Sequence, residues 1–114
     1  MLALCSGIIT NKPTNRVSSV GSESIFTCRI NRTDTRILWS YTAPSASLSQ
    51  SVFVGAAANN SFGKRYAVYN HSGQLDLKIE NIQHGDAGSY QCEEGVTSFA
   101  STADLIVIGK PMFC

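Results

Sequence analysis

The side chains that could support catalysis or bind a metal are few and scattered along the chain. Its 114 residues include two histidines, His71 and His84, and both fall in segments of turn composition. No Ser, His and acid arrangement, no Cys-x-x-Cys and no His-Glu-x-x-His sequence is present. Glu93 and Glu94 are adjacent, and strand alternation would send them to opposite faces. We therefore predict no enzyme activity, no metal site and no cofactor.

Short runs of alternating apolar and polar residues predict that the chain is built mainly of β-strands. The predicted strands cover residues 5–10, 16–20, 23–30, 36–41, 51–54, 64–69, 74–80, 89–94 and 99–108. Residues 70–73 and 95–98 have hairpin composition, residues 84–87 form one helical turn, and residues 56–63 are an edge strand or a loop. About nine short strands at this spacing predict an all-β sandwich.

The composition agrees with one β domain and excludes several other classes. Hydrophobic residues make up 43% of the chain, enough for a core, so the chain is not disordered. A net charge of +1 lacks the basic surplus that nucleic-acid binding needs. The longest apolar run, residues 52–58, is far shorter than the ~20 residues that span a bilayer. Any membrane attachment would therefore use a segment outside this chain.

One set of residues resembles a known family. Cys28 lies mid-strand, Trp39 lies on the next strand, and residues 86–92 read Asp-Ala-Gly-Ser-Tyr-Gln-Cys. This pattern resembles a V-set immunoglobulin domain over residues 8–108. The resemblance implies an immunoglobulin-like V-type β-sandwich of two antiparallel sheets with Greek-key connections.

The resemblance also implies roles for the residues that carry it. Cys28 and Cys92 would form a disulfide between the sheets, with Trp39 packed on the bond. Leu77 would fill the core from a neighbouring strand. Tyr90 would bury its ring, and its hydroxyl would bond a backbone carbonyl in the preceding turn.

The V subtype of the family implies one ion pair, and the last strand departs from the receptor pattern. Arg65 stands where V domains carry a basic residue, and it would pair with Asp86 at one end of the sandwich. Antigen-receptor V domains have two glycines in the last strand, whereas residues 99–107 contain none. The resemblance is therefore to an innate or early immune-type receptor domain rather than a rearranged antigen receptor.

The ends of the chain are interpreted separately. Residues 1–7 are an N-terminal arm or a signal-peptide remnant, and residues 109–114 are a linker or the start of a following domain. In this fold the two ends leave from opposite ends of the sandwich. A Cys5–Cys114 bond within the domain is therefore not expected, and pairing between molecules is the alternative.

Three Asn-x-Ser/Thr sequons lie in predicted loops or turns. They begin at Asn31, Asn59 and Asn70. Beside a disulfide-bonded fold they predict N-linked glycans on at least one asparagine. The competing interpretation is ordinary turn composition, since Asn and Ser favour turns in any case.

The sheet that carries Trp39 and Tyr90 is the candidate binding face. V domains commonly associate through this sheet, so the resemblance implies an interface there. The predicted interface residues are the outward-facing Leu38, Ser40, Phe53, Gln91, Glu93 and Ala100. In the alternative arrangement, Phe53 points inward and packs against Trp39.

The resemblance implies an extracellular recognition domain of an immune-type or adhesion receptor, at the cell surface or secreted. Its partner would be another protein, or a second copy of the chain, bound through the sheet face and loops. One alternative is a secreted pattern-recognition module that binds carbohydrate, which Tyr41, Tyr66 and Tyr69 leave open. The other alternative is a structural spacer in a longer protein.

Overall fold

The structure is a computed structural model that describes residues 9–11, 13–30, 37–54, 57–58, 63–71, 74–95 and 100–109. These residues form strands and one short 3-10 turn. The elements are β1 (Ile9–Asn11), β2 (Arg16–Ser19), β3 (Ser24–Phe26), β4 (Arg29–Ile30), β5 (Ile37–Thr42), β6 (Gln50–Val54), β7 (Ala57–Ala58), β8 (Tyr66–His71), β9 (Gln74–Ile79), η3 (His84–Asp86), β10 (Gly88–Glu94) and β11 (Ala100–Ile108).

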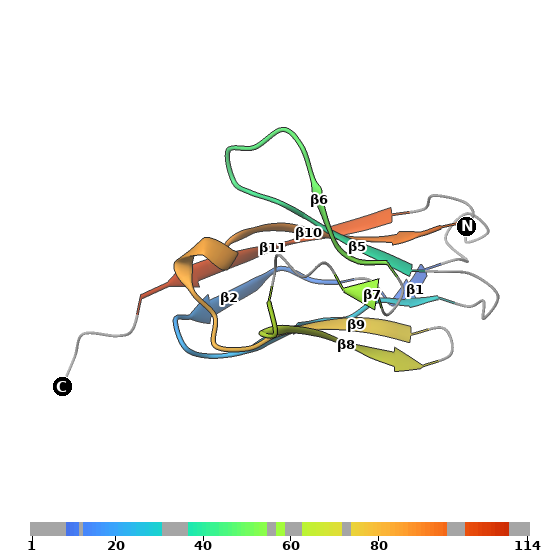
Figure 1. The fold of residues 1–114 in the computed structure, drawn as a ribbon, viewed down its shortest axis with the longest axis horizontal. Coiled ribbons are helices and arrows are strands. Elements are labelled where there is room, and N and C mark those ends of the chain that lie inside the picture. The colour runs from blue at the N-terminus through green and yellow to red at the C-terminus, as the bar shows by residue number, and fades with distance from the viewer. Residues whose placement is uncertain are drawn as a thin grey trace.

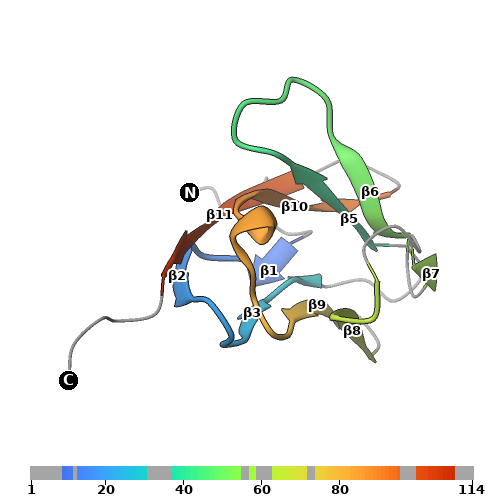
Figure 2. The same cartoon turned by 60° about the vertical axis from the view of Figure 1, so that its left-hand side comes forward.

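The strands form two sheets packed face to face (Figure 1, Figure 2). The first sheet has the order β1-β4-β9-β3, and β8 pairs with β9. The second has the order β2-β11-β10-β5-β6-β7. The predicted all-β sandwich is confirmed. The resemblance implied antiparallel sheets, but β2 pairs with β11 in parallel. Every other described strand pair is antiparallel.

The described residues form two more strands than the nine predicted, for two local reasons. The predicted strand over residues 23–30 is interrupted between β3 and β4. There the backbone N–H of Cys28 donates to the Asp76 carboxylate at 3.0 Å, a side-chain bond in place of a regular ladder bond. The ambiguous segment over residues 56–63 contributes the short strand β7, which extends the second sheet beside β6.

The core joins the two sheets through a disulfide and a tryptophan. Cys28 and Cys92 are bonded, with their Cα atoms 6.4 Å apart. Trp39 is fully buried, and its indole N–H donates to the carbonyl oxygen of Leu75 in the opposite sheet at 2.7 Å. Leu77 is also fully buried. The disulfide and the core positions implied by the family resemblance are therefore present in the structure.

Phe53 is buried, so the prediction that it points outward is wrong. Its side chain is only 5% exposed and belongs to the hydrophobic core. Strand alternation fails here because β5 and β6 change register: Trp39 pairs with Phe53, and Ser40 pairs with Ser51. Val52 is the extra residue of this bulge and is also buried, so two consecutive side chains face inward.

Several predicted features lie outside the described residues. These include the arm over residues 1–7, Cys5, Cys114, Asn31 and Asn59. Asn70 lies in the described strand β8, but its side chain is not described. Within the described part of the chain, no helix has the length and apolar character needed to cross a membrane.

Candidate binding face

A buried polar cluster fixes the start of β10. The guanidinium of Arg65 donates twice to the Asp86 carboxylate, at 2.7 and 3.0 Å. The Tyr66 hydroxyl donates to the same carboxylate at 2.5 Å, and the backbone N–H of Gln83 donates at 2.8 Å. The Tyr90 hydroxyl donates to the backbone carbonyl of Asp86 at 2.6 Å. The Arg65–Asp86 pair and the Tyr90 bond are both present, as the family resemblance implied.

This cluster shifts the pKa values of its acid and its phenols in opposite directions. Burial would raise the pKa of Asp86, but hydrogen bonds from Arg65, Tyr66 and Gln83 outweigh burial and hold that pKa below its usual value. Burial raises the pKa of both Tyr66 and Tyr90. At neutral pH the cluster therefore contains one carboxylate and two neutral phenols.

Replacing Asp86 with asparagine should remove part of the acid sensitivity of the fold. The folded-state pKa of Asp86 is depressed, so its carboxylate stabilises the fold above the unfolded-state pKa of about 4. That contribution is lost as the pH falls through the lower folded-state pKa. Asp86→Asn should also cost about 1–3 kcal/mol at pH 7, because Arg65 loses a charged acceptor.

Urea denaturation from pH 7 down to about pH 2 measures both effects. The wild-type unfolding free energy should fall more steeply below about pH 4 than that of Asp86→Asn. Glu23→Gln is the control, because Glu23 is an exposed acid that directly precedes β3 of the other sheet. Identical acid profiles for the wild type and Asp86→Asn would contradict this assignment.

The outer face of the second sheet brings five of the six predicted interface residues together. Gln91 pairs with Ser40, and Glu93 pairs with Leu38 on one side and Ala100 on the other. All five are partly or fully exposed. Phe53, the sixth, lies on the opposite side of this sheet, in the core.

The same face continues to residues that sequence analysis did not select. The Ser89 hydroxyl donates to the Asp104 carboxylate at 2.7 Å. Two residues further along β11, Ile106 is 54% exposed and pairs with Val17, which is 65% exposed. The alternation that places Ala100 outward also reaches Asp104 and Ile106, so this signal was available in the sequence.

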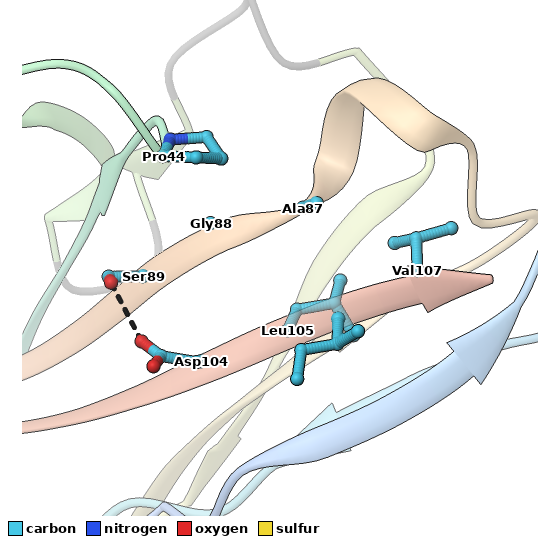
Figure 3. Close-up of a pocket in the computed structure, with 8 residues that line it drawn as sticks. Pro44, Ala87, Gly88, Ser89, Asp104, Leu105 and Val107 are labelled. Atoms are coloured by element: carbon cyan, nitrogen blue, oxygen red, sulfur yellow. Dashed lines mark hydrogen bonds between the residues drawn. The ribbon is translucent and has the colours of Figure 1, made fainter.

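A groove of about 410 Å³ lies at this end of the face (Figure 3). Its lining comes from the loop between β5 and β6, from the start of β10 and from β11: Pro44, Ala87, Gly88, Ser89, Asp104, Leu105, Ile106 and Val107. The loop from β5 to β6 projects beyond the two sheets (Figure 2).

The groove borders a backbone position that requires glycine. Gly88 has a φ of +146°, which L side chains rarely adopt. An added Cβ there would lie 2.5 Å from the carbonyl oxygen of Thr42 and 2.7 Å from the Tyr41 ring. Close packing of β10 against β5 therefore depends on the missing side chain.

The amino-acid sequence is similar to that of known proteins. The family described as Immunoglobulin V-set domain matches residues 11–108. Contactin-3 from Homo sapiens is 32% identical over 108 residues, which cover 90% of this chain. The chain spans 9% of the length of Contactin-3.

Proposed function

The chain belongs to the immunoglobulin V-set family, and we propose that it acts as an extracellular recognition domain of an adhesion or immune-type receptor. In this proposal it binds a protein partner through the outer face of the β2-β11-β10-β5-β6-β7 sheet. The domains of this family are generally binding domains rather than enzymes. The similarity to Contactin-3 supports a place at the cell surface or outside the cell. A germline-encoded receptor rather than a rearranged one remains part of the proposal.

The observation that carries this proposal is the chemistry of the outer face. Its centre presents the hydroxyl of Ser40 beside the amide of Gln91, and Leu38, two residues before Ser40 on β5, adds an apolar side chain. Polar side chains around an apolar one can hydrogen-bond a partner while the apolar side chain is buried against it, which is the usual composition of a protein contact. Because Phe53 is buried, Leu38 is the large apolar residue of the predicted set that remains on this face.

An exposed alanine on each sheet provides a matched test of which face binds. Ala100 lies on the proposed face in β11, and Ala67 lies in β8 of the other sheet. Ala100→Arg should weaken binding about tenfold or more, because it inserts a long charged side chain into the contact. Ala67→Arg should leave binding within about twofold of wild type, because surface changes away from a contact have small effects.

The measurement uses beads coated with the chain, because many copies on one bead raise a weak affinity to a detectable level. Bead–bead aggregation reports self-association, and attachment to a panel of cultured cells reports a different partner. Melting curves establish that both variants are folded. Absence of wild-type binding, or an equal loss in the two variants, would overturn the proposed face.

The carbohydrate alternative receives less support from the structure than the protein partner does. Tyr66 is 7% exposed, and its hydroxyl is bonded to Asp86. The Tyr41 hydroxyl donates to the backbone carbonyl of Ala87 at 2.6 Å. Two of the three tyrosines that left sugar binding open therefore serve the fold. The side chain of Tyr69 is outside the described residues.

Three assignments remain proposals beside this function. The first is that residues 1–7 form an arm or a signal-peptide remnant. The second is that residues 109–114 are a linker or the start of a following domain. The third is that Asn31, Asn59 or Asn70 carries a glycan.

A further inference from the structure

The four inner strands of the proposed binding face carry acids but no basic residues. Among the described residues of β5, β6, β10 and β11, none is Lys or Arg. Of the carboxylates on these strands, Glu94 is fully buried, so Glu93 and Asp104 supply the charge of the outer face. A chain with a net charge of +1 therefore presents a locally negative face. Complementary potentials would favour a partner with a positive surface.

The Asp104 carboxylate is held in place before any partner arrives. Its Oδ1 accepts a hydrogen bond from the Ser89 hydroxyl at 2.7 Å. The backbone N–H of Asp104 donates to the side-chain oxygen of Asn15 at 2.9 Å. A carboxylate has about four lone-pair positions, so one bond from Ser89 leaves room for further donors. A partner cation would thus meet an acceptor that needs little reorganisation.

Apolar surface lies beside this acceptor, inside the groove. Pro44 lies in the β5–β6 loop on one side of the groove (Figure 3). Ile106, which also lines the groove and is 54% exposed, lies two residues after Asp104 on β11. An acceptor flanked by aliphatic surface matches a side chain with a long apolar stem and a cationic end. Arginine has both parts, and its planar guanidinium donates to a carboxylate through two parallel bonds.

We propose that this groove receives an arginine side chain of the protein partner, with its guanidinium on Asp104 and its stem against Pro44 and Ile106. The inference rests on the proposed function, and it specifies that the partner presents a basic surface. A second copy is a poor occupant, because a symmetric face-to-face contact would bring two acidic faces together. Arg16, the basic residue among the described strand residues of this sheet, is exposed on the outermost strand β2 and in register with Leu105.

The test titrates the ¹⁵N-labelled full chain with N-acetyl-arginine N-methylamide and follows the backbone amide signals. We expect saturable shifts at Ser89, Asp104 and Ile106. The neutral isostere N-acetyl-citrulline N-methylamide should bind at least fivefold more weakly. Asp104→Asn should weaken arginine binding at least tenfold. Glu23→Gln should leave it unchanged, because Glu23 is an exposed acid that precedes β3 of the other sheet.

Each other outcome counts against the groove. The proposal is overturned by an absence of shifts at these residues, by equal binding of the citrulline compound, or by unchanged binding to Asp104→Asn. The amide spectra show directly whether each variant is folded. If Asp104→Asn is not folded, Ser89→Ala keeps the carboxylate but removes its positioning bond, and it should weaken arginine binding measurably. The probe needs no partner, so this result and the Ala100→Arg comparison can fail independently.

Discussion

Replacing both Cys28 and Cys92 with alanine is expected to lower the free energy of unfolding by about 4 kcal/mol. The bond joins residues separated by 64 positions, and the chain-entropy model gives this value for a loop of that length. Domains of this size are stable by only about 5–15 kcal/mol in total. The double variant should therefore be marginally folded or unfolded at body temperature.

Urea denaturation of the oxidised protein measures this loss, and the other two cysteines provide the control. Cys5 and Cys114 lie near the ends of the chain and are not expected to pair within the domain. Replacing both of them with alanine should leave the unfolding free energy within about 0.5 kcal/mol of wild type. A comparable loss in the control, or mass mapping that links Cys28 to Cys5 or Cys114, would contradict the role of the Cys28–Cys92 bond.

The strands and the core were predictable because their signals are local. Leu75, Leu77 and Ile79 alternate with polar residues, and all three are buried on one face of β9. The cysteine and tryptophan spacing adds the connection between the sheets, because few folds place a disulfide beside one tryptophan at these distances along the chain. Each of these signals depends on neighbours within a few residues or on a family pattern.

The local exceptions were not predictable, because they arise from contacts between distant segments. The bulge at Val52 appears only when β6 is aligned with β5, and a one-residue change in register reverses which side chains face the core. Likewise, the interruption near Cys28 involves Asp76, which is 48 residues away in sequence. Neither strand carries a residue type that marks the irregularity.

The groove could be predicted only in part for the same reason. Strand alternation places Asp104 and Ile106 on the outer face, so these positions follow from the sequence of β11. The position of Pro44 depends on how the loop after β5 is placed beside β10 and β11. The bond from Ser89 requires the exact pairing of Ser89 with Asp104. A candidate site made from three segments thus required the three-dimensional arrangement.

The burial of Phe53 leads to a second prediction with a large expected effect, in which stability falls while binding is retained. Phe53→Ala should cost about 3–5 kcal/mol, because it removes a buried ring and leaves a cavity beside the core. For a domain of about 100 residues, such a loss lowers the melting temperature by roughly 15–25 °C. Binding by the fraction that remains folded should change little, since the ring does not reach the outer face.

Leu38→Ala is the matched variant, because Leu38 neighbours this site on β5 but lies on the outer face. Its partly exposed side chain should cost about 1 kcal/mol of stability, while bead attachment should weaken about tenfold if Leu38 is the apolar centre of the contact. Thermal denaturation ranks the two variants by stability, and bead binding, measured below both melting temperatures, ranks them by affinity. The two rankings should be opposite if Phe53 is buried and Leu38 is on the outer face. A small stability loss in Phe53→Ala together with a tenfold loss of binding would indicate that the aromatic ring lies on the outer face. That result would also contradict the bulge at Val52, because only the bulge turns Phe53 inward.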